Sequence, residues 1–266
     1  MPRTLGQLET AALAFAQMRN LRTLRVGELA SGLRLSAKQE RELLSRMARS
    51  GLIANVRKGL YLFPPRLPLG GIWTPDEATA INALMADKNA RYQIAGPKAF
   101  NRYGYSDQLP SLTTIYNDAI SGERRVGSVT LQLIKVARDR LGGVEKVRMP
   151  SGETLVYSSR ARTLVDAVYD WSRFDSLPEA YDWIRADLVA GRIAADELAR
   201  AAVRYGNMGS IRRIGAILER LGASKAARSR LARAVTATTA KIPLVPTRPA
   251  RGPVSRPWGV VINDRP

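Results

Sequence analysis

The sequence predicts an α+β protein in which an N-terminal winged helix-turn-helix is followed by a larger mixed α/β domain with a helical second half. Three observations support this prediction. Residues 26–63 combine an amphipathic helix with two short β-type runs. Further β-type runs lie between residues 91 and 157, and from residue 159 onward helical patterns alternate with glycine stops. These patterns divide the chain into residues 1–65, residues 72–240 and a tail of residues 241–266.

A helix that begins at Ala37 is the best-supported element of the N-terminal domain. Ser36 and Gln39 have the spacing of a capping box, in which the Ser36 hydroxyl accepts from the amide of Gln39 and the Gln39 side chain reaches back. On a helical wheel the apolar residues fall on one side, namely Leu43, Leu44, Met47 and Ala48. This side can pack on a preceding short helix over residues 26–30, which leaves the cationic side facing outward.

The segment after this helix has the pattern of a β-hairpin. Gly51 ends the helix, and residues 52–56 and 60–63 are short β-type runs on either side of Arg57-Lys58-Gly59. Glycine at the tip supplies the positive φ that a tight turn needs. Two cations at a hairpin tip beside a basic helix suit a DNA duplex, because the helix can enter the major groove while the wing touches neighbouring phosphates.

We therefore predict that residues 1–65 bind double-stranded operator DNA. The alternatives are that the helix-turn-helix is a protein–protein module and that its cations form an ordinary solvated face. Lys38 and Arg41, near the start of the helix, are expected to reach base edges. The full set of predicted DNA-binding residues is Ser36, Lys38, Gln39, Arg41, Ser45, Arg49, Arg57 and Lys58.

The distribution of charge supports binding to a polyanion. Residues 1–65 hold 11 Lys and Arg against 4 Asp and Glu, residues 66–204 hold 19 against 17, and residues 205–266 hold 12 against 2. The three net charges of +7, +2 and +10 sum to the +19 of the whole chain. Positive charge is thus concentrated toward both ends of the sequence, as expected when cations release counterions from phosphates.

Composition also excludes several classes of function. The chain has no cysteine and no histidine, which excludes disulfides, thiolate chemistry, Cys/His zinc sites and a Ser-His-Asp triad. No apolar run approaches the ~20 residues that span a bilayer. We expect a cytoplasmic protein that is not an enzyme, with no metal, no cofactor and no membrane partner.

The chain after the winged unit begins with a break at residues 64–71, where prolines and a Gly-Gly pair interrupt regular structure. Thr74 at the N-cap and Pro75 at the first helical position predict a helix to about Met85. Strands are predicted over 91–94, 113–116, 128–136, 145–149 and 154–157. Helices are predicted over 160–171, 177–190, 195–205, 210–221 and 224–238, and an extended Pro/Arg-rich basic tail follows them.

Two short constellations have spacings that could carry chemistry. Arg162 and Asp166 lie at i,i+4, which predicts a surface ion pair worth a few tenths of a kcal/mol. Asp166 and Asp170 have the same spacing and could hold a metal ion, but no His or third acid is placed to complete such a site. We predict a structural helix here.

The sequence resembles the AbiEi-type antitoxins of abortive-infection toxin–antitoxin systems. The likeness begins with Arg57-Lys58-Gly59-Leu60-Tyr61-Leu62 and continues in the second half. The further matching segments are Ile94-Ala95-Gly96-Pro97, Tyr103-Gly104-Tyr105, Gln108-Leu109-Pro110, Arg162-Thr163-Leu164-Val165-Asp166, Gly206-Asn207, Arg212-Arg213-Ile214-Gly215 and Leu218-Glu219-Arg220-Leu221-Gly222. Their order covers about residues 5–235, and the tail after Ile242 has no counterpart.

The resemblance implies a phage-defence regulator encoded beside its toxin. The winged domain of such a protein represses the operon promoter. The second domain counters a cognate nucleotidyltransferase-type toxin by an antagonism that does not require a stable complex. The basic helices near the C-terminus are then the expected antitoxin surface, formed by Arg212, Arg213, Arg220, Lys225, Arg228, Arg230 and Arg233.

Other interpretations of the chain remain open at this point. The basic helices could be a solvated face, could contact nucleic acid or could meet an acidic partner. The protein could instead be a one-component winged-helix transcription factor, in which case residues 72–204 should form an effector pocket with converging polar groups. A kinase or transferase would need a cleft with clustered carboxylates.

Overall fold

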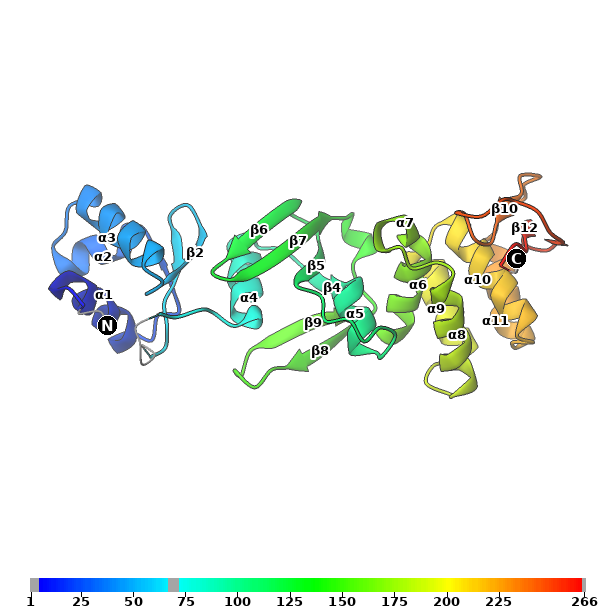
Figure 1. Cartoon of the computed structure of the whole chain (residues 1–266), viewed down its shortest axis with the longest axis horizontal. Coiled ribbons are helices and arrows are strands. Elements are labelled where there is room, and N and C mark those ends of the chain that lie inside the picture. Colours follow the sequence, from blue (N-terminus) through cyan, green and yellow to red (C-terminus); the bar gives the residue numbers. More distant parts are fainter. Residues whose placement is uncertain (1–4, 67–71, 265–266) are drawn as a thin grey trace. The chain divides into compact units, whose positions relative to one another are not determined.

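The computed structural model describes residues 5–66 and 72–264, which form a mixed α+β fold (Figure 1). The predicted α+β class is therefore confirmed. The helices are Gln7–Met18 (α1), Glu28–Leu33 (α2), Ala37–Arg49 (α3), Glu77–Asp87 (α4), Pro97–Arg102 (α5), Arg160–Tyr169 (α6), Trp171–Phe174 (α7), Glu179–Val189 (α8), Ala195–Tyr205 (α9), Met208–Arg220 (α10) and Lys225–Ala234 (α11), with a short 3-10 turn at Arg138–Arg140. In the described part of the chain, no helix combines the length and apolar character needed to cross a bilayer.

The strands form three sheets. The strands are Thr23–Arg25 (β1), Ala54–Arg57 (β2), Leu60–Leu62 (β3), Tyr92–Ala95 (β4), Leu112–Asn117 (β5), Gly122–Val126 (β6), Val129–Lys135 (β7), Val144–Arg148 (β8), Thr154–Ser158 (β9), Ile242–Pro243 (β10), Val254–Ser255 (β11) and Val260–Val261 (β12). The largest sheet has the order β6-β7-β5-β4-β9-β8, and the two smaller sheets have the orders β1-β3-β2 and β10-β12-β11. In the largest sheet, β6 and β7 form an antiparallel hairpin, whereas β4 and β9 run parallel.

The N-terminal elements follow the order α1-β1-α2-α3-β2-β3 and enclose a core of their own. Helix α3 begins with the predicted capping box, in which Ser36 accepts from the amide of Gln39 and the Gln39 side chain accepts from the amide of Ser36. Strand β3 pairs antiparallel with both β1 and β2. The buried side chains of this core all come from residues 12–63, among them Leu24, Leu29, Leu44, Met47 and Phe63. We call residues 5–63 the N-terminal module.

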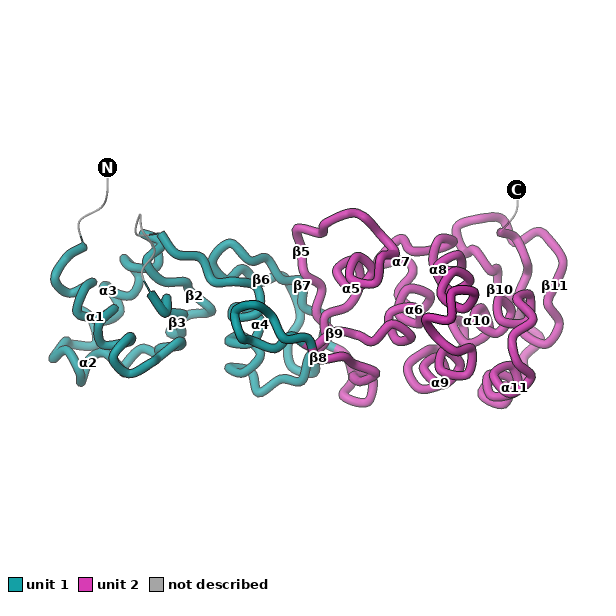
Figure 2. Tube along the Cα trace, turned by 90° about the horizontal axis from the view of Figure 1, so that it is seen from below, with its two compact units in different colours: residues 1–92, 117–135, 147–155 teal, residues 93–116, 136–146, 156–266 magenta. Residues whose placement is uncertain are grey.

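The chain divides into two compact units, which are coloured separately in Figure 2. Unit 1 contains residues 1–92, 117–135 and 147–155, so α4 and the β6–β7 hairpin group with the N-terminal module. Unit 2 contains residues 93–116, 136–146 and 156–266. The predicted boundary at residues 64–71 lies partly outside the described residues, because these exclude 67–71.

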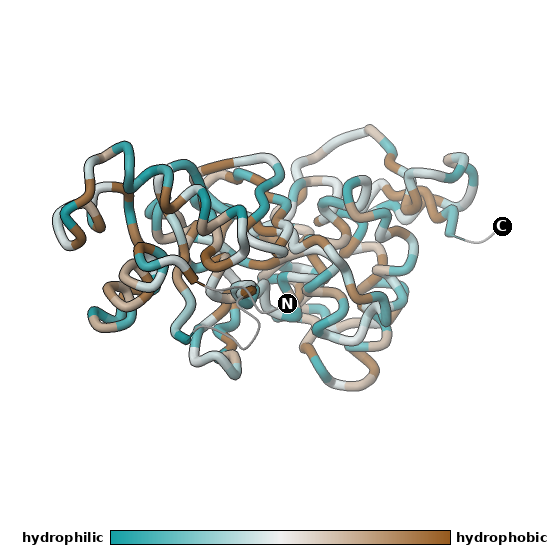
Figure 3. The backbone as a smooth tube through the Cα atoms, turned by 60° about the vertical axis from the view of Figure 1, so that its left-hand side comes forward, coloured by the Kyte–Doolittle hydropathy of each residue, from teal (hydrophilic) through white to brown (hydrophobic). Residues whose placement is uncertain are grey.

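Unit 2 is built around helices α6, α8, α9 and α10, whose apolar faces share one core. The hydropathy colouring in Figure 3 shows apolar and polar stretches alternating along the chain, as expected for elements with one buried face. The C-terminal segment, residues 241–264, joins this core: Leu244, Val245 and Val260 are completely buried and Trp258 is nearly so. The sequence predicts an extended tail here. In the structure, apolar residues between the prolines are buried in the unit 2 core, so the segment packs against the helices.

Several element boundaries differ from those the sequence predicts. Helix α4 is capped by Asp76, whose carboxylate accepts from the amide of Thr79 at 3.0 Å, rather than by Thr74. The helix predicted over 160–171 is divided at Asp170 into α6 and α7. Strands β1 and β6 are not predicted by the sequence. Strand β1 has only three residues, which is too few to show a periodicity, and β6 carries adjacent exposed arginines in place of an apolar alternation.

Candidate nucleic-acid interface

One buried carboxylate joins α2 to α3. Glu40 lies on α3 and is completely buried, although it is charged. Its oxygens accept from the backbone amides of Gly27 at 2.7 Å, Leu29 at 2.8 Å and Ala30 at 3.3 Å. These amides form the start of α2, where N–H groups lack helical partners and the helix dipole favours a negative charge. Glu40 therefore joins the two helices.

The opposite side of α3 is exposed and mainly cationic. The buried side of α3 contains Leu43, Leu44 and Met47, as the sequence predicts. It also contains Glu40, which the predicted apolar side does not include. The exposed residues of α3 also include Glu42 and Arg46. We call the exposed residues that are predicted to bind DNA the α3 face; they are Lys38, Gln39, Arg41, Ser45 and Arg49.

Within the α3 face, the first turn combines exposure with local order. The Nε group of Arg41 donates to the carbonyl of Ala37 at 2.9 Å, which holds this side chain along the first turn of the helix. Gln39 is engaged in the capping box. Lys38 and Arg41 thus lie exposed at the end of the helix that is predicted to reach bases.

The β2–β3 hairpin places the predicted wing residues in different environments. Gly59 has φ +80°, which closes the turn, and Lys58 beside it is exposed. Arg57 instead turns toward α4. Its Nε and Nη2 groups donate to Asp87 at 2.7 and 2.6 Å, and its Nη1 group donates to the carbonyl of Lys58 at 2.7 Å.

Asp87 collects further cations around its carboxylate. Arg25 of β1 lies 3.2 Å away, Lys88 lies 3.3 Å away, and the Asp87 side chain is only 2% exposed. The hydrogen bond from Arg57, aided by Lys88, lowers the pKa of Asp87 from 3.8 to about 2. Asp87 is therefore ionised at neutral pH and bound to the β2–β3 hairpin.

The predicted antitoxin surface is not a single exposed patch. Arg212 is only 4% exposed, and its guanidinium donates to the carbonyls of Trp258, Ala240 and Gly259 at 2.5 to 2.7 Å. Burial lowers the pKa of Arg212. The assignment of Arg212 to a surface is therefore wrong, since this side chain anchors the C-terminal segment to α10.

The remaining residues predicted for the antitoxin surface differ in their exposure to solvent and in whether they pair with other groups. Arg213 is half-buried and donates to the carbonyl of Pro243, and burial lowers its pKa. Arg230 pairs with Asp196 at 3.1 Å, and Arg220 pairs with Asp264 at 2.5 Å. Arg228 donates to the carbonyl of Ala223, whereas Lys225 and Arg233 on α11 are exposed.

The Arg162–Asp166 pair is also not on the surface. Both side chains are at most 1% exposed and meet at 2.8 Å, and Arg140 reaches the same carboxylate at 3.2 Å. Arg162 also donates to the carbonyls of Arg140 and Gly142. This network ties α6 to the 3-10 turn, so the segment is structural as predicted, but the expected surface ion pair is wrong because the pair is buried.

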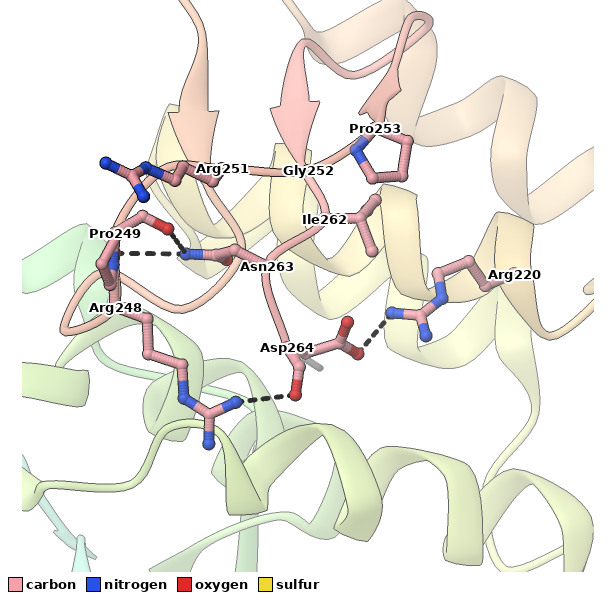
Figure 4. Close-up of a pocket in the computed structure, with 9 residues that line it drawn as sticks. All are labelled: Arg220, Arg248, Pro249, Arg251, Gly252, Pro253, Ile262, Asn263 and Asp264. Carbon is pink, nitrogen blue, oxygen red and sulfur yellow. Dashed lines mark hydrogen bonds and ion pairs between the residues drawn. The ribbon is translucent and has the colours of Figure 1, made fainter. Parts of the chain in front are cut away.

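The described residues of unit 2 line several hollows, including two with polar side chains in their lining. The first has a volume of about 940 Å³ and lies between the end of α10 and the C-terminal segment, where Arg220 and Arg248 both bind Asp264 (Figure 4). The second has a volume of about 540 Å³ and is lined partly by aromatic rings. Phe100 contacts both Phe174 and Trp183 there, with ring centroids 5.7 and 5.0 Å apart. In the described residues, no group of three or more acidic side chains is arranged to hold a metal ion.

Glu40 and Asp87 join the elements of the N-terminal module and α4, yet neither is among the residues predicted from the sequence. Glu40 had a detectable signal, because it is the one charged residue that falls among the apolar positions of α3. Asp87 had none, since its partners Arg25 and Arg57 lie 62 and 30 residues away in the sequence. Pairing over such separations follows from the tertiary fold.

Comparison with known proteins gives information on the fold. No protein-family model and no curated protein matches the chain. Among solved structures, the crystal structure of the RV2827C protein from Mycobacterium tuberculosis is similar, with a TM-score of 0.63 and 15% sequence identity. The match covers 97% of this chain and 92% of that chain, so the likeness in fold extends over nearly the whole of both proteins.

Proposed function

We propose that this chain binds duplex DNA through a winged helix-turn-helix formed by the N-terminal module. The observation that carries the proposal is the α3 face, a row of exposed polar and cationic side chains on a helix that Glu40 holds against α2. In a helix-turn-helix the second helix enters the major groove, and its first residues contact base edges. Helix α3 supplies Lys38 and Arg41 at that end.

The remaining elements support the same role. The order α1-β1-α2-α3-β2-β3, with β3 between β1 and β2, supports the assignment, because winged-helix domains combine their elements in this order. The β2–β3 hairpin is then the wing, and exposed Lys58 at its tip is available to a phosphate. Ser45 and Arg49 continue the α3 face toward the end of the helix.

We further propose that the DNA-binding protein is an autorepressor and an antitoxin against a nucleotidyltransferase-type toxin. This part rests on the sequence resemblance to AbiEi-type antitoxins. Of the residues predicted for the antitoxin surface, Lys225 and Arg233 are the best candidates, because both are exposed and neither makes an ion pair within the described residues.

Selection from a random duplex library tests the DNA-binding proposal and does not require the operator sequence. The full chain should enrich one sequence, and it should bind the enriched duplex at least about 1000-fold more tightly than random duplex. Recovery of no preferred sequence, together with affinity no better than that for random duplex, would contradict sequence-specific binding.

The antitoxin proposal requires that a nucleotidyltransferase gene adjoin this one, and co-expression with its product tests the proposal. Wild-type protein should restore growth, and Lys225→Glu with Arg233→Glu should not. The matched control is Lys241→Glu with Arg256→Glu, two exposed cations of the C-terminal segment. Full rescue by the α11 variant would exclude this surface.

A second candidate function is effector binding, favoured by the hollow beside Phe100, Phe174 and Trp183. Its volume of about 540 Å³ is in the range of small-molecule sites, and Ser106, Gln108 and Glu179 add polar groups to its lining. Phe174→Ala should then abolish any ligand-induced change in DNA affinity while leaving unliganded DNA binding unchanged.

A further inference from the structure

The wing and the strand beside it carry two arginines that their own unit already neutralises. Arg57 uses Nε and Nη2 on Asp87 and Nη1 on the carbonyl of Lys58, so each of its three guanidinium nitrogens has a protein partner. Arg25, on the adjoining strand β1, lies 3.2 Å from the same carboxylate. Asp87 is the last residue of α4, which follows the N-terminal module in the chain.

A carboxylate and a DNA phosphate offer the same kind of partner to an arginine. Both present paired oxygens to the planar guanidinium, and both bind it with charge-assisted hydrogen bonds. An arginine bound at both Nε and Nη2 to a carboxylate therefore has its fork occupied. Lys58 is exposed and donates to no carboxylate within the described residues, so it stays available to a phosphate.

We propose that Asp87 competes with DNA phosphates for Arg57 and Arg25, so that α4 sets the affinity and salt dependence of the DNA-binding face. This inference rests on the proposed DNA-binding function and concerns its regulation. Release of Arg57 to DNA leaves a carboxylate that is 2% exposed with fewer cations around it, which opposes the exchange. Any displacement of α4 from the hairpin frees both arginines at once.

The alternative is that Asp87 only fastens α4 to the hairpin. The two explanations predict different DNA affinities when the negative charge is removed. If Asp87 competes with phosphate, removing its charge frees Arg57 and Arg25 to contact DNA phosphates, and the DNA affinity increases. If it only fastens the helix, DNA binding stays unchanged or weakens along with stability.

The test compares Asp87→Asn with the matched variant Asp76→Asn in the full chain. Asp76 lies at the other end of α4, where its carboxylate accepts from Thr79, and among the described residues it forms no ion pair with Arg25, Arg57 or Lys58. Asparagine also serves as an N-cap. The probe is a fluorescent random-sequence duplex of about two helical turns. Asp87→Asn should bind it roughly ten-fold more tightly at low salt, and its slope of log affinity against log salt should steepen by about one to two units. Asp76→Asn should match the wild type.

Two further variants keep the proposal testable if Asp87→Asn fails to fold. Arg57→Ala in the otherwise wild-type chain should change the affinity less than two-fold and leave the salt slope unchanged, because that arginine is already paired. Lys58→Ala should flatten the slope by about one unit. Equal flattening by both variants would overturn the proposal, as would a folded Asp87→Asn protein with wild-type affinity.

These outcomes are distinct from failure of the proposed function. If the wild-type chain binds no duplex at low salt, the DNA-binding proposal itself fails. If it binds and Lys38→Ala with Arg41→Ala weakens binding, but Asp87→Asn has no effect, only the competition is excluded.

Discussion

Glu40 and Asp87 are acidic side chains in a strongly basic chain, and each is almost fully buried among donors from another element. Glu40 binds the amides that open α2, and Asp87 binds the guanidinium groups of the hairpin and of β1. Removal of Glu40 leaves buried and half-buried amides without partners, which costs more than the net gain of an ordinary hydrogen bond. Removal of Asp87 releases cations that are partly exposed, from 33% for Lys88 to 56% for Arg25. Each can therefore be tested by a single conservative substitution.

Replacement of Glu40 should destabilise the N-terminal module. Glu40→Ala leaves several amides at the start of α2 unpaired and should lower the free energy of unfolding by about 3 kcal/mol, with Glu40→Gln costing about half as much. Urea denaturation provides the measurement. Glu42→Gln, an exposed change on the same helix, should be nearly neutral, and equal stability of Glu40→Gln and Glu42→Gln would exclude the capping role.

The pKa of Asp87 predicts a stability difference that depends on pH. Because folding lowers this pKa from 3.8 to about 2, ionised Asp87 stabilises the folded state fully above pH 4. That contribution is lost as the pH falls from about 4 through about 2. The difference in unfolding free energy between wild type and Asp87→Asn should therefore shrink over this window. A difference that stays constant down to pH 2 would show that the carboxylate charge contributes nothing.

Among the elements, the C-terminal segment packs against α10 because a glycine on that helix leaves room for a tryptophan of the segment. Gly215 on α10 has no side chain, and a Cβ built there would lie 2.3 Å from the indole of Trp258. Arg212, one turn earlier on α10, donates to two carbonyls of the C-terminal segment, those of Trp258 and Gly259, and to the carbonyl of Ala240 just before that segment. Together they make residues 241–264 part of the unit 2 core.

Two substitutions test this packing through their coupling. Trp258→Ala should cost about 3–5 kcal/mol, and Gly215→Ala about 1–3 kcal/mol because the added methyl meets the indole. In the double variant the methyl occupies space that the indole has left, so the total cost should be less than the sum. Two nearly neutral single variants in thermal denaturation would mean that the segment is not packed in solution.

At the scale of the whole molecule, much of the local structure could be predicted from the sequence, whereas the pairing of distant charges could not. The predicted start of α3 is correct because a capping box is encoded within four residues. Strand β1 escapes prediction since three residues with two exposed side chains carry little periodicity. Because α10 is rich in basic residues, the sequence predicts that Arg212 is exposed to solvent. Its three carbonyl partners lie in residues 240–259, which pack against α10 only in the folded chain.

The division into units bears on a fragment experiment. The core of the N-terminal module comes entirely from residues 12–63, so a fragment of residues 1–66 should fold. Because it lacks Asp87, Arg25 and Arg57 should be free in it, and its binding to random duplex should depend more steeply on salt than that of the intact chain. A shallower dependence in a folded fragment would contradict the assignment of the hairpin arginines.

If the α3 face reads DNA, a Lys38→Ala, Arg41→Ala variant should bind the duplex that the wild type selects roughly 10-fold to 1000-fold more weakly than the wild type does. Its loss of affinity for random duplex should be much smaller, because base contacts carry about 1–3 kcal/mol of discrimination each. Lys225→Ala with Arg233→Ala, which removes the same charge from α11, should leave the selected-duplex affinity unchanged. Wild-type affinity in the α3 variant, or equal losses on both duplexes, would contradict DNA recognition by this face.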